Sequence, residues 1–135
     1  MPMTLSAAPR PSLALFTSEP VRAAVDLLQH LTHGAPAAPV SSDGHTVVLF
    51  PGLGANALSM WPLQRHLSGA GYRALDWGQG FNIGPSGDID AWLQGLTQHV
   101  LARVDEAGAQ AEAPISLVGW SLGGFDAREI AKLVP

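Results

Sequence analysis

Leu117-Val118-Gly119-Trp120-Ser121-Leu122-Gly123-Gly124 is the most informative stretch of this chain. Gly119-x-Ser121-x-Gly123 matches the nucleophile elbow, a tight strand-to-helix turn that presents a reactive serine. Glycines flank the serine because the turn is crowded and its backbone is strained. An apolar segment precedes the motif and a helical pattern follows it, which is the expected context. The alternative is a plain glycine-rich turn with an ordinary solvated serine.

Helical and strand patterns alternate along the rest of the chain. Periodicity predicts a helix that opens at Glu19-Pro20 and closes at Gly34. Continuous apolar runs predict buried strands. The strands are expected at 46–50, 72–77 and 115–118, and the further helices at 55–67, 88–107 and 125–133. This alternation predicts an α/β fold in which helices flank a three-stranded parallel sheet.

Length and composition narrow the functional classes. The chain has 135 residues, of which 47% are hydrophobic, so it can form one domain with a core. Its formal net charge is −4 and it has no basic run, which argues against a nucleic-acid partner. It has no cysteine, which excludes disulfides and thiolate catalysis, and nothing implies a metal or an organic cofactor.

The two ends of the chain are expected to differ in order. Residues 1–19 are expected to form a flexible leader that carries Pro2, Pro9 and Pro11, and residues 20–135 an incomplete domain. No apolar run approaches the length of a membrane span, and the N-terminus lacks the pattern of a signal peptide. A cytoplasmic location is therefore the default expectation.

From about residue 46 to residue 135 the chain resembles the α/β-hydrolase superfamily, in particular bacterial lipase- or esterase-like members. The second element of the resemblance is the glycine turn after the first strand, Pro51-Gly52-Leu53-Gly54, where Pro51 replaces a histidine that is often present. The resemblance implies that Ser121 attacks an ester or related acyl bond of a small molecule. It also implies that the backbone N–H groups of Leu53 and Leu122 form the oxyanion hole, in which each donor is worth about 3–4 kcal/mol.

The order of residues in this superfamily places an acid and then a histidine after the serine. After Ser121 the acids are Asp126 and Glu129, on a helix expected to run away from the site. All five histidines precede the serine: His30, His33, His45, His66 and His99. We therefore expect an N-terminal portion of a hydrolase, inactive by itself. A gene fragment, a frameshifted product, a chain cut at Pro135 or a partial record of a longer enzyme would each explain it.

The resemblance also implies that the strands lie in the order second, first, third. The strand at 115–118 would then be an exposed edge and a site of possible self-association. The loop Trp77-Gly78-x-Gly80-x-Asn82-x-Gly84-Pro85 is similar to one in a subgroup of uncharacterised bacterial members. A loop shaped only for packing explains those residues equally well.

Two other interpretations compete with the hydrolase. Gly52, Gly54 and Ala57 fit a dinucleotide-binding fingerprint, and Asp76 lies where a ribose contact would be. Against it, Pro51 directly precedes the first glycine, and this Rossmann-type interpretation leaves the glycines around Ser121 unexplained. The other alternative is a non-catalytic remnant that serves as an interaction module.

Overall fold

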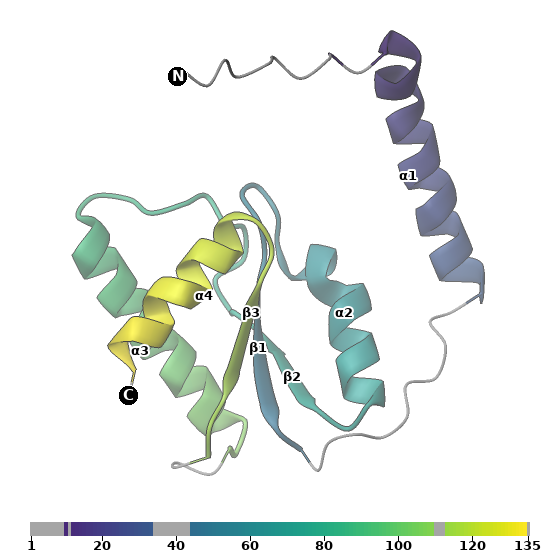
Figure 1. Cartoon of the computed structure of the whole chain (residues 1–135). Coiled ribbons are helices and arrows are strands. Elements are labelled where there is room, and N and C mark those ends of the chain that lie inside the picture. Colours follow the sequence, from purple (N-terminus) through teal and green to yellow (C-terminus); the bar gives the residue numbers. More distant parts are fainter. Residues whose placement is uncertain (1–9, 11, 34–43, 110–112, 135) are drawn as a thin grey trace, which may run out of the picture. The chain divides into compact units, whose positions relative to one another are not determined.

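The computed structural model describes residues 10, 12–33, 44–109 and 113–134 (Figure 1). The chain divides into two compact units, Met1–Pro36 and Ala37–Pro135. The first unit contains helix α1 (Leu13–His33), and the second contains a sheet and three helices. Among the described helices, none combines the length and the apolar character needed to cross a bilayer.

Helix α1 begins earlier than the sequence pattern predicts. Its first residue is Leu13, and Pro20, the predicted first position, lies inside it. The Leu15 N–H donates to Ser12 Oγ (3.3 Å), so Ser12 acts as a cap ahead of a run of good helix formers. Residues 13–19 of the expected flexible leader are therefore helical, whereas residues 1–9 and 11 lie outside the described part.

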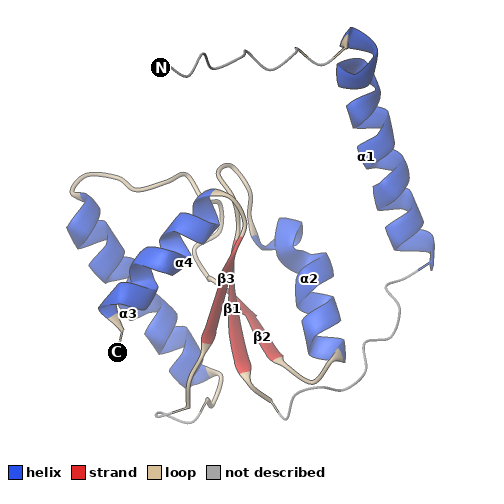
Figure 2. Cartoon of the chain, viewed as in Figure 1, coloured by secondary structure: helices blue, strands red, loops and turns tan. Residues whose placement is uncertain are grey.

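The sheet has the predicted parallel topology. Its strands are β1 (Thr46–Phe50), β2 (Arg73–Asp76) and β3 (Ser116–Gly119), in the order β2-β1-β3 (Figure 2). Strand β1 is buried along its whole length because it has a neighbour on each side. Strand β3 has no second neighbour among the described strands and alternates exposed and partly buried residues.

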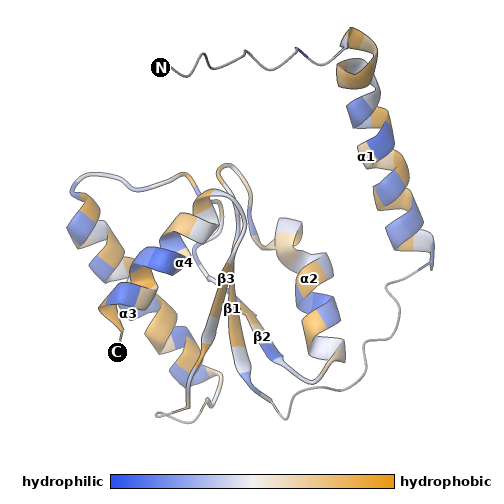
Figure 3. Ribbon diagram, viewed as in Figure 1, coloured by the Kyte–Doolittle hydropathy of each residue, from blue (hydrophilic) through white to orange (hydrophobic). Residues whose placement is uncertain are grey.

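Alternate residues of β1 pack into two separate cores, as the two-residue period of a strand requires. Val48 and Phe50 lie in the larger core with residues from α3 (Ile89–Glu106) and α4 (Leu122–Leu133). Val47 and Leu49 pack on the other face against Met60 of α2 (Ala57–Gly69). Apolar and polar residues accordingly alternate along α3 and α4 (Figure 3).

The helix that follows the serine also begins earlier than the sequence pattern predicts. The helix after the serine is predicted from Phe125 but begins at Leu122. The Gly123 N–H donates to the Trp120 carbonyl and the Gly124 N–H to the Ser121 carbonyl, which starts the first turn. Apolar periodicity does not detect this turn because glycines form part of it. Consequently α4 starts directly after Ser121.

Candidate active site

Ser121 has the backbone conformation of a nucleophile elbow. Its φ is 52° and its ψ is −119°, and it is the one non-glycine residue with positive φ among the described residues. Such a conformation costs a residue with a Cβ atom about 1–3 kcal/mol. The serine is exposed between the end of β3 and the start of α4.

The two glycines of the motif are required by close backbone contacts. A Cβ atom at Gly119 would collide with the backbone of Gly123 and Gly124. A Cβ atom at Gly123 would collide with the carbonyl groups of Phe50 and Pro51. Strand, turn and helix therefore approach one another so closely that any side chain at either position would force them apart.

The glycine turn after β1 lies directly beside the serine. A Cβ atom at Gly52 would be 3.4 Å from Ser121 Cβ and 3.1 Å from Trp120 Cδ1. The Ala55 N–H donates to the Gly52 carbonyl (3.0 Å), and Gly54 has a φ of 73°. A positive φ at the third position is what a type II turn requires. The turn that carries Leu53 and the elbow that carries Ser121 thus form one site.

The N–H groups of Leu53 and Leu122 have no hydrogen-bond partner in the described part of the chain. Leu122 is the first residue of α4, where backbone N–H groups lack intrahelical acceptors and the helix end carries partial positive charge. Leu53 belongs to a turn in which the Gly54 and Ala55 N–H groups are both occupied. Two unengaged donors are therefore available on the two segments that meet at Ser121.

A cavity of about 460 Å³ opens beside the serine. Leu53, Met60, Leu63, Trp120 and Ser121 are among the residues that line it, so most of its wall is apolar. A larger hollow of about 1000 Å³ lies along β3, α3 and α4, and Ser121 does not line it. The smaller cavity is therefore the one that adjoins the candidate nucleophile.

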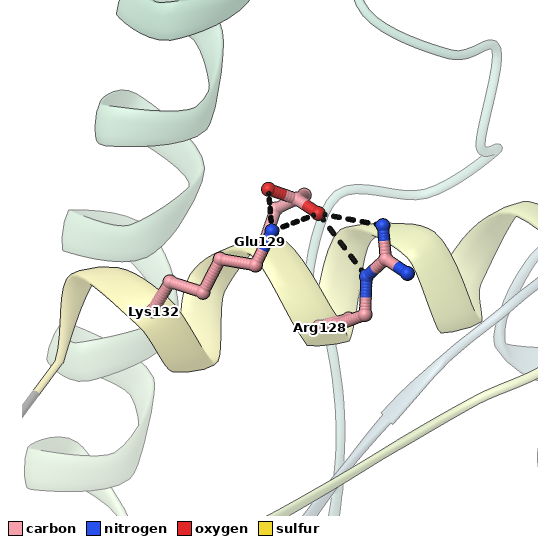
Figure 4. Close-up of polar contacts among 3 residues, drawn as sticks. All are labelled: Arg128, Glu129 and Lys132. Carbon is pink, nitrogen blue, oxygen red and sulfur yellow. Dashed lines mark hydrogen bonds and ion pairs between the residues drawn. The ribbon is translucent and has the colours of Figure 1, made fainter.

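Neither acid downstream of the serine is placed as a partner for it. Glu129 accepts from Lys132 Nζ (2.8 Å) and from Arg128 Nη2 (3.1 Å) on α4 (Figure 4). The Lys132 hydrogen bond, with a further contribution from Arg128, lowers the pKa of Glu129. Asp126 is fully buried, and burial raises its pKa, although a hydrogen bond from Asn82 acts in the opposite direction.

No histidine of the second unit hydrogen-bonds to Ser121 in the structure as described. His45 Nε2 is 2.9 Å from Ser116 Oγ, at the end of the sheet opposite the elbow. His66 lies on α2 and His99 on α3. The remaining two, His30 and His33, belong to the first unit. The described residues of the second unit therefore hold a candidate nucleophile without a histidine base beside it.

The dinucleotide-binding interpretation is wrong for two reasons. In the dinucleotide fold the third strand lies outside the second, whereas here β3 pairs with β1. Asp76, the expected ribose ligand, accepts from the Gly78 N–H (2.6 Å) and forms an ion pair with Arg103 (3.3 Å). Gly52 and Gly54 instead shape the turn beside Ser121.

Asn82 is a residue of this site that sequence reasoning missed. It is fully buried, although its neighbours Phe81 and Ile83 are 63% and 80% exposed. Its side-chain amide donates to the Pro51 carbonyl and to Asp126 Oδ2, both at 2.9 Å. The only signal in the sequence was its place in the glycine-rich loop 77–85, which does not distinguish a buried asparagine from an exposed one.

Comparison with known proteins agrees with this geometry. The model of the alpha/beta hydrolase family matches residues 47–134, which include β1 from its second residue, the glycine turn and the serine elbow. No curated protein and no solved structure gives a significant match. The strand order β2-β1-β3 and the elbow after β3 are the arrangement that the sequence resemblance implies. The chain belongs to the alpha/beta hydrolase family.

Proposed function

We propose that this chain carries the nucleophile and the oxyanion hole of a serine hydrolase of the esterase or lipase type. The observation that carries the proposal is the strained, positive-φ backbone of Ser121. Strain of this kind persists where the surrounding structure enforces it, and it is concentrated at functional sites. The tight contacts at Gly119 and Gly123 supply that enforcement.

The proposed reaction is acyl transfer. Ser121 Oγ attacks the carbonyl carbon of an ester and loses its proton to a base. The carbonyl oxygen becomes an oxyanion and accepts hydrogen bonds from the N–H groups of Leu53 and Leu122. The alcohol then leaves with a proton, and water hydrolyses the acyl-serine. The apolar wall of the 460 Å³ cavity favours a small-molecule substrate with an apolar acyl group.

The base is the component that the described residues do not place beside the serine. A serine without its base loses most of its reactivity, whereas the oxyanion hole retains a residual effect. Added imidazole can stand in for the missing side chain. The expected behaviour is therefore no turnover by the chain alone and slow acylation of Ser121 when imidazole is added.

A fluorophosphonate probe tests this proposal, because its adduct places an oxygen in the oxyanion hole. The 135-residue chain and Ser121→Ala are labelled with and without imidazole, and mass spectrometry locates the adduct. Circular dichroism checks that both proteins are folded. We expect labelling at residue 121 that rises with imidazole and is absent from the variant. A folded chain that shows no labelling dependent on Ser121 would refute the proposed function and favour a non-catalytic interaction module.

We also propose that copies of the chain associate through β3. In the described sheet this strand has a free edge, and Val118 on it is 37% exposed. The 1000 Å³ hollow, which Leu117 and Val118 help to line, adjoins the same strand. Free edges with apolar side chains are templates for pairing with another chain.

A further inference from the structure

The loop between β2 and α3 brings a single buried polar residue, Asn82, to the back of the candidate site. Its backbone forms two reciprocal hydrogen bonds with the glycine turn. The Gly54 N–H donates to the Asn82 carbonyl (2.7 Å), and the Asn82 N–H donates to the Ala55 carbonyl (2.8 Å). The turn that carries Leu53 is therefore bonded to the loop at Gly54 and Ala55, the two residues after Leu53.

The side chain of Asn82 connects the same turn to the helix that follows the serine. The side-chain nitrogen Nδ2 donates both to the Pro51 carbonyl on the turn and to Asp126 Oδ2 on α4. Its oxygen, Oδ1, accepts from the Gly84 N–H (3.0 Å). Every polar group of Asn82 is thus engaged, and its amide bridges the two segments that carry the Leu53 and Leu122 N–H groups.

Gly84, two residues after Asn82, completes the connection. Gly84 has a φ of 80°, and a Cβ atom there would lie 3.7 Å from Leu122 Cδ2 and 4.0 Å from Leu53 Cδ1. The hydrogen bond from Gly84 to Asn82 Oδ1 holds the loop in this place. The loop therefore lies against the side chains of both residues whose N–H groups form the proposed oxyanion hole.

The hydrogen-bond partners at position 82 require the donors and the acceptor of a carboxamide. The site needs two donors, for Pro51 and Asp126, and one acceptor, for Gly84. An ionised aspartate has the same shape but no donor, and a serine has one donor. Because the position is fully buried, water cannot replace a missing partner without opening the site.

We propose that Asn82 is a positioning residue that sets the separation between the two oxyanion donors by fastening the glycine turn to α4. This inference rests on the proposed function, since the donors matter only if Ser121 is acylated. Loss of the amide bridge should misplace the Leu53 N–H while leaving the elbow intact. A displacement of about 1 Å at a reacting centre can reduce the rate roughly a hundredfold.

The test compares Asn82→Asp, Asp126→Asn and the double variant with both changes. Asn82→Asp alone sets two carboxylates face to face, so it can fail to fold. The double variant exchanges the two groups: an amide at 126 donates to a carboxylate at 82, while the Pro51 carbonyl loses its donor and faces a carboxylate oxygen. Thr97→Val is the matched control, because it removes a buried hydrogen bond (2.7 Å to the Leu93 carbonyl) within α3, away from the site.

Two quantities are measured for each folded variant. The first is the rate of imidazole-assisted fluorophosphonate labelling at Ser121, and the second is amide hydrogen exchange of peptides that cover residues 51–55. For the double variant we expect an unfolding midpoint above that of Asn82→Asp and a labelling rate lower than that of Thr97→Val by about tenfold or more. We expect faster exchange at 51–55 in the double variant and unchanged exchange there in Thr97→Val. If Asn82 had a purely structural role, the double variant would recover both stability and labelling rate relative to Asn82→Asp.

The outcomes separate this inference from the proposed function. Normal labelling and normal exchange at 51–55 in the double variant would overturn the role of Asn82 and leave the hydrolase proposal intact. If the unmodified chain shows no Ser121-dependent labelling, the proposed function fails, and the exchange data alone decide whether Asn82 fastens the turn. Faster exchange confined to residues 51–55 then supports the fastening, and unchanged exchange refutes it.

Discussion

Replacing Ser121 by glycine should make the protein more stable than replacing it by alanine. Both changes remove the hydroxyl group, but only glycine removes the Cβ atom that makes a φ of 52° and a ψ of −119° unfavourable. Relief of that strain is worth about 1–3 kcal/mol. The extra conformational freedom of glycine in the unfolded chain costs about 0.5–1 kcal/mol. The net advantage of glycine over alanine is therefore between about 0 and 2.5 kcal/mol, with a midpoint of about 1.2 kcal/mol.

A helical position provides the matched control because the sign should reverse there. Ala102 is exposed within α3, and glycine at such a position should lower the free energy of unfolding by about 1 kcal/mol. Urea-induced unfolding followed by far-ultraviolet circular dichroism measures all four proteins: unmodified, Ser121→Gly, Ser121→Ala and Ala102→Gly. This signal is preferable to tryptophan fluorescence because Trp120 adjoins the substituted residue.

The reasoning makes a claim about sign as well as magnitude. If Ser121→Gly is no more stable than Ser121→Ala while Ala102→Gly is destabilised as expected, the backbone at 121 is not strained in the folded chain. The observation that carries the proposed function would then be lost.

Three further predictions concern neighbouring features. Gly123→Ala should prevent the close approach of the elbow to the Phe50 and Pro51 carbonyls, and it should lower the free energy of unfolding by about 3 kcal/mol or more. Thermal unfolding measures this loss, and a near-neutral change would show that position 123 has space for a side chain. Because burial raises the pKa of Asp126, the native state binds its proton more tightly than the unfolded state does, and that contribution to stability is lost as pH rises through the raised pKa. Asp126→Asn should therefore gain stability relative to the unmodified chain as the pH rises above the ordinary aspartate pKa of about 4, whereas a pH-independent difference in urea titrations would rule this out. Val118→Lys should reduce self-association through β3, which size exclusion at several protein concentrations would measure. If the elution volume depends on concentration to the same extent in the variant, the chain does not associate through that edge.

Local patterns in the sequence predicted the elements that contain the elbow. The run Thr46–Phe50 has no polar residue after its first position, and it is the buried central strand. The glycine spacing around Ser121 predicted the strand-to-helix turn, because that turn leaves no space for side chains at 119 and 123. Patterns located helix ends less well: α1 begins at Leu13 and α4 at Leu122, since capping and turn hydrogen bonds determine those ends.

The contacts of Asn82 show why the rest of the site was not predictable. Its side chain bonds to Pro51, 31 residues earlier, and to Asp126, 44 residues later. No periodicity within the loop 77–85 reports partners at that separation. Burial of Asn82 between two exposed apolar residues also runs against the usual rule that polar residues lie outside.

Short-range patterns in the sequence were sufficient to predict the strands, the elbow and the family, because backbone sterics and runs of apolar residues involve near neighbours in the chain. The environments of Asp76, Asp126 and His45 depended on the packing of segments far apart in the chain, whereas Glu129 is paired within its own helix. Packing engaged Asp76 with Arg103, buried Asp126 against Asn82 and placed His45 at the opposite end of the sheet from Ser121. A carboxylate or an imidazole acquires its role from the groups that surround it in space, and those groups were brought together only when the helices folded onto the sheet.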